Sequence, residues 1–168
     1  MHLPPAEWYA SLPSFLASAT ALLTDDAGRI LLVKPNYRPH WNLPGGVLHG
    51  DEPPHACCTR EVREELGVDI VTGGLLVVDW VPPTADRKAW FGFVFDGGVL
   101  PPGQSIELQA DELDGYEFVP ADEATTRLTT NTANRLRAAL QAKAAGTTRY
   151  LFNGREVHTP PAPHQASL

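Results

Sequence analysis

Glu61, Glu64 and Glu65 are spaced at i, i+3 and i+4, so their side chains share one face if the segment is a helix. Carboxylates crowded in this way repel one another and raise each other's pKa unless a cation neutralises them. Ligands made only of oxygen suit a hard ion, so the pattern predicts a site for Mg2+, with Mn2+ as the alternative. A solvated acidic helix face would carry the same residues, and the surrounding sequence must decide between the two.

The surrounding residues predict a helix from Pro54 to Leu66. A proline suits the first turn, where its missing N–H costs little, and Gly67 suits the left-handed end of a helix. Asp51 or Glu52 could accept from the unpaired N–H groups at the start and complement the helix dipole. An apolar stripe on the neighbouring face predicts the side that packs on the core: Cys58, Val62 and Leu66.

Residues 46–68 resemble the Nudix box, G-x5-E-x7-R-E-U-x-E-E-x-G-U, in which U is an apolar residue. Every constrained position carries a residue of the required type: Gly46, Glu52, Arg60, Glu61, Val62, Glu64, Glu65, Gly67 and Val68. Nudix hydrolases use a divalent metal to cleave a nucleoside diphosphate linked to another moiety. The resemblance therefore favours a metal site over a solvated face. It also implies the Nudix fold, an α/β/α sandwich with a mixed β-sheet between helices.

The resemblance also implies roles for the residues of the box. Glu64 and Glu65 resemble the principal metal ligands, and Glu61 resembles a further ligand or the general base that activates water. Arg60 resembles the residue that holds a box glutamate by a charge-assisted hydrogen bond. The catalytic residues implied are thus Glu61, Glu64 and Arg60, with the choice of general base open.

Residues around the box complete the implied site. The carbonyl of Gly45 resembles another metal ligand, since a Gly-Gly turn allows the backbone to approach an ion. By the same resemblance, Gly46 and Glu52 are residues that support the loop of the box. Family members often add an acidic residue from a later loop; Glu112 is the candidate here, and Asp111 is the near alternative.

Fewer residues point to the part of the substrate beyond the diphosphate. Trp41 is the best candidate for stacking on a base, because it lies in a loop beside the Gly-Gly turn, and Lys34 and Arg38 could contact phosphate. Tyr37, Trp80 and Trp90 are further aromatic candidates. In the family, a Pro about fifteen residues past the box is associated with ADP-ribose cleavage. Pro82 and Pro83 lie at about this distance from the box in this chain. In family members that hydrolyse 8-oxo-dGTP, an Asn at the start of the last helix recognises the purine, and Asn131 is the residue at that place here. The alternative is that Asn131 caps the helix.

Short alternating elements separated by turn residues predict a mixed sheet flanked by helices. We expect one domain over residues 1–157 and a mobile tail over 158–168. The predicted strands are Phe15 to Leu23, Arg29 to Lys34, Leu75 to Val81, Ala89 to Phe95 and Tyr116 to Val119. A loop is predicted over Gly97 to Gly103 and a helix over Asn131 to Ala144. Arg149 to Val157 is predicted to form a last short strand or an extended segment.

Composition excludes several classes of function. The chain has 168 residues and a formal net charge of −7, without a basic run, which argues against general nucleic-acid binding. The adjacent cysteines, Cys57 and Cys58, form neither a C-x-x-C metal pair nor a plausible disulfide, so packing explains them. No signal peptide and no membrane span is evident. We expect a cytoplasmic monomer or homodimer with no membrane partner.

The best-supported function is a Mg2+-dependent pyrophosphohydrolase with a small-molecule nucleotide as its substrate. Its substrate would be a nucleoside triphosphate, possibly in oxidised form, or a nucleoside diphosphate sugar such as ADP-ribose. The alternative is a non-catalytic Nudix-fold nucleotide sensor, which usually has a degraded box or a DNA-binding partner domain. A prenyl diphosphate isomerase of the same fold needs a catalytic Cys outside the box, and this chain has none.

Overall fold

The computed structural model describes residues 4–157, so the predicted tail at 158–168 lies outside the described part. Its strands are β1 (Leu16–Thr24), β2 (Ile30–Pro35), β3 (Gly45–Val47), β4 (Leu75–Val81), β5 (Trp90–Val99), β6 (Leu113–Val119), β7 (Arg149–Phe152) and β8 (Arg155–Glu156). Its helices are α1 (Pro5–Ser11), α2 (Pro54–Leu66), α3 (Ala121–Arg127) and α4 (Thr130–Ala145). None of the helices in this described part is long and apolar enough to span a bilayer.

The strands form one mixed sheet in the order β6-β2-β1-β5-β4-β7-β8, and β3 pairs with β1 outside this path. β1 runs parallel to β5, and β4 runs parallel to β7, whereas the other pairs are antiparallel. β1 pairs with β2 only at Thr24 and Ile30, and with β3 from Ser18 to Thr20. The sheet therefore divides beside β1, with β2 and β6 on one branch and β3 on the other.

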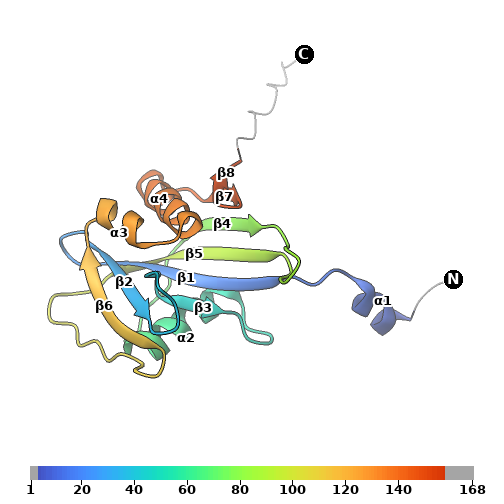
Figure 1. Cartoon of the computed structure of the whole chain (residues 1–168), viewed down its shortest axis with the longest axis horizontal. Coiled ribbons are helices and arrows are strands. Elements are labelled where there is room, and N and C mark those ends of the chain that lie inside the picture. Colours follow the sequence, from blue (N-terminus) through green and yellow to red (C-terminus); the bar gives the residue numbers. More distant parts are fainter. Residues whose placement is uncertain (1–3, 158–168) are drawn as a thin grey trace, which may run out of the picture.

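Helices cover both faces of the sheet (Figure 1), which confirms the predicted α/β/α layering. On one face, α4 and α3 cover an apolar core that includes Leu22, Val77, Val94 and Leu136. On the other face, α2 covers a second core. Side chains alternate between the two faces along each strand, so successive residues of β1 and β3 point to different sides of the molecule.

Helix α2 matches its predicted bounds, Pro54–Leu66, and ends at Gly67 in the left-handed conformation with φ 65°. Its predicted apolar stripe is fully buried. The predicted side-chain cap is wrong: Pro53 occupies the N-cap position, and no side chain of the described residues 4–157 caps the helix. The Glu52 carboxylate instead accepts from the backbone N–H of His49 and from Arg60.

β1 and β2 are each shifted by one residue from their predicted bounds, whereas β5 and β6 extend further beyond their predicted ends. β5 continues past Phe95 to Val99, into the first part of the predicted loop, because Gly97, which has no side chain, lies against Leu23; a Cβ there would be 2.7 Å from a Leu23 methyl group. β6 begins at Leu113 rather than Tyr116, because pairing with β2 continues to Pro35.

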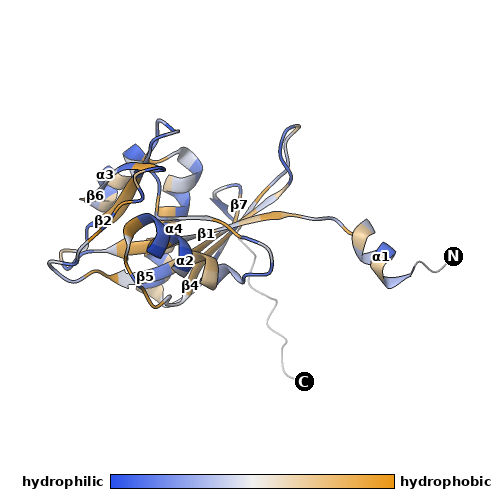
Figure 2. Cartoon of the chain, turned by 90° about the horizontal axis from the view of Figure 1, so that it is seen from below, coloured by the Kyte–Doolittle hydropathy of each residue, from blue (hydrophilic) through white to orange (hydrophobic). Residues whose placement is uncertain are grey.

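Three elements were not predicted. β3 contains two glycines and lacks an alternating pattern, so its pairing with β1 determines it. α3 is a seven-residue helix with two threonines, which have low helix propensity. α1 lies apart from the rest of the fold in both views (Figures 1 and 2), and it buries none of its residues.

Candidate active site

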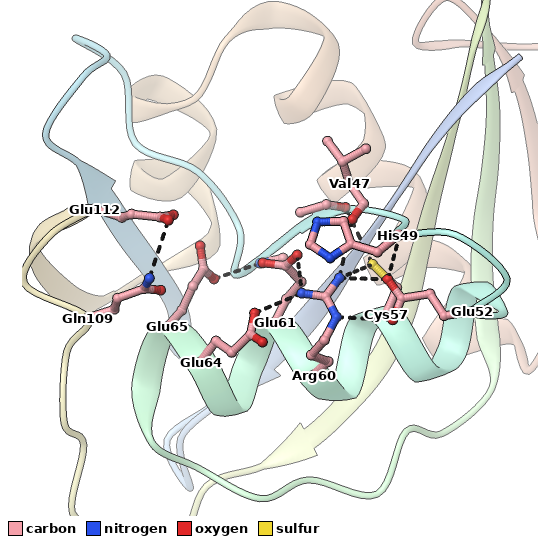
Figure 3. Close-up of polar contacts among 12 residues, drawn as sticks. Val47, His49, Glu52, Cys57, Arg60, Glu61, Glu64, Glu65, Gln109 and Glu112 are labelled. Carbon is pink, nitrogen blue, oxygen red and sulfur yellow. Dashed lines mark hydrogen bonds and ion pairs between the residues drawn. The ribbon is translucent and has the colours of Figure 1, made fainter.

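The acidic face of α2 lies against β3, and its carboxylates follow one another along the helix (Figure 3). Glu65 is the innermost carboxylate, with 8% of its surface exposed, and it accepts a 2.8 Å hydrogen bond from the backbone N–H of Gly45. The Glu61 side chain is 14% exposed, and that of Glu64 is 50% exposed. The three carboxylates thus form a gradient from the interior to solvent.

Arg60 connects the carboxylates of the box. Its Nη2 lies 2.6 Å from Glu52, and its Nη1 lies 2.8 Å from Glu61 and 2.7 Å from Glu64. Its Nε also donates to Glu52, and its Nη2 also donates to the carbonyl of Val47. One planar guanidinium therefore fixes α2 to the loop that precedes it and orients two of the carboxylates that resemble metal ligands and bases.

Burial and charge perturb these groups in different directions. Burial, followed by the nearby charges of Glu61, Glu112 and Glu64, raises the pKa of Glu65 to about 8. Burial also raises the pKa of Glu61, against the opposing effect of Arg60. The hydrogen bonds from Arg60 and from the N–H of His49 lower the pKa of Glu52 to about 2. The site therefore crowds carboxyl groups where solvent screens charge least, which favours the protonated form of Glu65 in the absence of a cation.

The Gly-Gly pair is required for this geometry. A Cβ on Gly46 would lie 2.5 Å from the carboxylate of Glu61, so the missing side chain leaves room for that group. Gly45 has φ 138°, and a Cβ there would collide with the backbone of Ala19 and Thr20. Both glycines thus allow β3 to lie between β1 and the glutamates of α2.

Glu112 lies in the loop just before β6, and its side chain extends towards Glu65 (Figure 3). Gln109 donates a 3.3 Å hydrogen bond to the Glu112 carboxylate. Asn36, which directly follows β2, holds this loop by donating to the backbone carbonyls of Asp111 and Glu112. The structure therefore places Glu112 beside the carboxylates of the box, whereas Asp111 contributes its backbone to the loop.

The donor set has the chemistry that a hard cation requires. Its donors are carboxylate oxygens, and one of them is buried and surrounded by like charges that a cation would neutralise. Within residues 4–157, however, no three His, Cys, Asp or Glu side chains already converge on a single point as ligands. Arg60 accounts for this arrangement, because it holds Glu61 and Glu64 in its own hydrogen bonds. The residues fit a magnesium site, which the Glu64 carboxylate would complete by turning from Arg60 towards the ion.

The two cysteines do not behave as nucleophiles. Both are fully buried and unpaired, and burial raises the pKa of Cys57 to about 11 and that of Cys58 to about 12. A thiol reacts as its thiolate, so neither side chain is reactive near neutral pH. Cys57 also contacts the carbonyl of Gly46 and the Arg60 guanidinium, which makes it part of the packing beneath the site.

A cleft of about 380 Å³ begins beside Gly45 and runs over the α4 face of the sheet. Arg38 and Trp41 line it, as the sequence predicts for substrate contacts, and Arg127 stacks over Trp41 at 5.2 Å from the ring centroid. Lys34 is not part of the lining; its amine donates to the carbonyls of Pro35 and Arg38 and so shapes the loop.

Other aromatic and polar candidates occupy different places. Trp90 lines the cleft, and its indole N–H donates to Ser18, whereas Trp80 packs against Phe15 and Phe91. Asn131 lies outside the cleft lining and donates to Asn153.

Sequence reasoning did not identify two residues that shape the cleft. Arg135, on α4, lines it and pairs with Asp79, which is fully buried in β4. The available signal was the charged Asp79 inside the apolar run Leu75–Val81, because a buried charge requires a partner.

Comparison with known proteins assigns a family. A model of the NUDIX domain matches residues 14–141. A MutT-like protein of Streptomyces ambofaciens is 28% identical over 130 residues, which cover 77% of this chain and 80% of that protein. The m7GpppN-mRNA hydrolase of Saccharomyces cerevisiae is 38% identical over 50 residues, 30% of this chain and only 5% of that one. A MutT protein structure from Methanosarcina mazei Go1 matches with a TM-score of 0.66 and 26% identity, covering 79% and 99% of the two chains.

The fold, the complete box and the family model together define the class: the chain belongs to the NUDIX domain family. It is a hydrolase that acts on phosphorus-containing anhydrides.

Proposed function

We propose that the chain is a Mg2+-dependent pyrophosphohydrolase that cleaves a diphosphate linkage in a nucleotide. The observation that carries the proposal is the arrangement of Glu61, Glu64 and Glu65 beside Gly45, where the substrate cleft begins. The substrate class comprises nucleoside triphosphates, including oxidised ones, and nucleoside diphosphate sugars such as ADP-ribose.

The carboxylates of α2 together with the Gly45 carbonyl and Glu112 would hold the ion. When bound, Mg2+ polarises phosphate oxygens and offsets the charge that develops as the anhydride bond breaks. A water oxygen attacks phosphorus, the bond to the leaving phosphate breaks, and Glu61 or Glu64 accepts the proton released by the water. Arg60 orients both candidate bases, because each accepts from its Nη1.

The cleft supplies contacts for the rest of the nucleotide. Trp41 offers an indole fixed by Arg127 for stacking on a base, and the guanidinium of Arg38 offers a cation for phosphate oxygens. These contacts bring the diphosphate to the end of the cleft at Gly45, where the carboxylates lie.

A substrate screen tests this function. Purified protein is incubated with nucleoside triphosphates, 8-oxo-dGTP and ADP-ribose, in either Mg2+ or excess EDTA, and the products are identified by 31P NMR. Hydrolysis at a diphosphate linkage that requires Mg2+ supports the proposal. Tight nucleotide binding without turnover of any compound would instead indicate a sensor.

A further inference from the structure

The cleft has an unusual charge for this protein. Arginine side chains from three separate segments of the chain line it, and no Asp or Glu among residues 4–157 does, although the chain carries a net charge of −7. The three arginines are Arg38, Arg87 and Arg135. A cleft lined by one sign of charge attracts ligands of the opposite sign.

Arg135 is held more firmly than the other two. Its Nε donates a 2.6 Å hydrogen bond to Asp79, whose side chain is fully buried. The other Asp79 oxygen accepts from the backbone N–H of Gly154 at 3.0 Å, so both oxygens are engaged. Within the described chain, neither Nη of Arg135 makes a hydrogen bond, so this guanidinium is anchored at one edge and retains donors at the other.

The sheet provides a place for this side chain. The Arg135 guanidinium lies on Gly92 of β5, where a Cβ would be 3.1 Å from its Cζ. By contrast, Arg87 donates to the carbonyls of Pro82 and Lys88 in its own turn, and Arg38 stacks over Tyr37. Arg135 is therefore the preorganised cation of the cleft.

The strand register places Arg135 away from the diphosphate end. Gly92 pairs with Ser18, and Ser18 pairs with Val47, which follows the Gly-Gly pair in β3. Two strand spacings separate Gly92 from Val47, or about 10 Å. A diphosphate held by the carboxylates of α2 would therefore have its own site, and an anion at Arg135 would be a second group of the same ligand.

We propose that Arg135, positioned by Asp79, binds a second phosphate carried on the nucleoside at the end remote from the scissile diphosphate. The preferred substrate is then a nucleotide with phosphate at both ends, held between two fixed indoles of the cleft, Trp41 and Trp90. The remote phosphate is either a monoester on the ribose or the diester that joins a second nucleotide. This assignment rests on the proposed function for its substrate class.

Binding without turnover tests the proposal. In EDTA, tryptophan fluorescence or calorimetry would compare adenosine or guanosine with the same nucleoside carrying a 3′-phosphate, a 2′-phosphate or a 5′-phosphate. We expect the 3′- or 2′-phosphate to tighten binding at least tenfold in the wild type. A 3′,5′-linked dinucleoside monophosphate, compared with its free nucleosides, distinguishes a diester from a monoester.

Matched variants assign the effect to Arg135. Arg135→Gln should abolish the gain from the 3′- or 2′-phosphate, whereas Arg137→Gln, an exposed arginine of the same helix, should retain it. Arg135→Gln leaves Asp79 buried without its cation. The double variant Asp79→Asn/Arg135→Gln removes that unpaired charge, and it should show the same loss of affinity for the 3′- or 2′-phosphate.

Two results would overturn the assignment. In the first, Arg135→Gln still binds the 3′- or 2′-phosphorylated nucleoside more tightly than the unmodified nucleoside. In the second, Arg135→Gln loses only the affinity gained from the 5′-phosphate, which would place Arg135 beside the diphosphate that is cleaved. Because EDTA excludes turnover, these results are independent of the substrate screen. If Mg2+-dependent hydrolysis occurs but the remote phosphate adds nothing, this inference fails while the proposed function stands.

Discussion

Arg60 occupies carboxylates of the box that the proposed cation would bind. Its Nη1 binds Glu61 and Glu64 together, whereas Glu65, among residues 4–157, accepts only from the Gly45 backbone. Glu64 is the more exposed partner and has the least packing to lose, so it is the group best able to turn from Arg60 to an ion. The three glutamates share one face of the helix, but their side chains differ in how readily they can change partners.

Replacing Arg60 by Lys should reduce turnover more than stability. Lys keeps the charge but not the planar fork that reaches Glu52, Glu61 and Glu64 together. We expect kcat to fall by about 10–100-fold, the usual cost of losing a group that orients a metal ligand. Steady-state kinetics and thermal unfolding would measure both effects, with Arg63→Lys on the same helix as the control. Unchanged turnover in Arg60→Lys would show that the site needs only a positive charge.

Glu112 should contribute to catalysis although it lies outside the box. The negative charge of Glu112 contributes to raising the pKa of Glu65. A carboxylate in this place can bind the ion or orient the attacking water. We expect Glu112→Gln to lower kcat by about tenfold or more with little change in KM. Asp111→Asn, in the same loop, is the control. Equal effects of the two changes would assign the role to the loop rather than to the Glu112 carboxylate.

The contact between β3 and α2 leaves no room for a side chain at Gly46. Gly46→Ala would place a methyl group 2.5 Å from the Glu61 carboxylate. The carboxylate must then move, so kcat should fall at least tenfold, with destabilisation of about 1–3 kcal/mol from overpacking. Gly115→Ala in β6, where a Cβ would meet open space, is the matched control. Kinetics and thermal unfolding that do not distinguish the two variants would contradict the close packing described.

Local chemistry in the sequence was enough to predict some elements. Prolines and a glycine set the ends of α2, and its apolar stripe identified the packed face, so box residues such as Glu61, Glu64 and Glu65 could be placed together. β3 could not be predicted, since its pairing partner β1 lies more than twenty residues away. Glu112 was predicted by resemblance, because no local pattern connects β6 with α2.

The substrate cleft depends on the whole molecule and was predicted only in part. Trp41 and Arg38 are close to the Gly-Gly pair in sequence, and the structure places both in the lining. Arg135 reaches the same cleft from α4 through a pair with Asp79, a separation of 56 residues that spacing arguments do not address. Asn131, one helical turn earlier, faces Asn153 instead.

The pH dependence of global stability should report on Glu65. Its pKa is raised to about 8, so its contribution to stability without metal is full below the unfolded value of 4.5 and is lost as pH rises through 8. In EDTA, the unfolding temperature should therefore fall between pH 6 and pH 9 by more than about 3 °C, which corresponds to roughly 1 kcal/mol. Glu65→Gln should show a smaller fall, and Mg2+ should reduce it in the wild type. An equal fall in both proteins would contradict the raised pKa.

If the carboxylates of α2 perform metal-dependent hydrolysis, Glu64→Gln should remove most of the activity. Glu64 is half exposed, so Gln should preserve the fold, which circular dichroism would verify. On the best substrate of the screen, kcat in saturating Mg2+ should fall at least about a hundredfold. Asp69→Asn, an exposed acid beyond the same helix, should keep wild-type turnover. Wild-type turnover in a folded Glu64→Gln variant would show that hydrolysis does not depend on the Glu64 carboxylate.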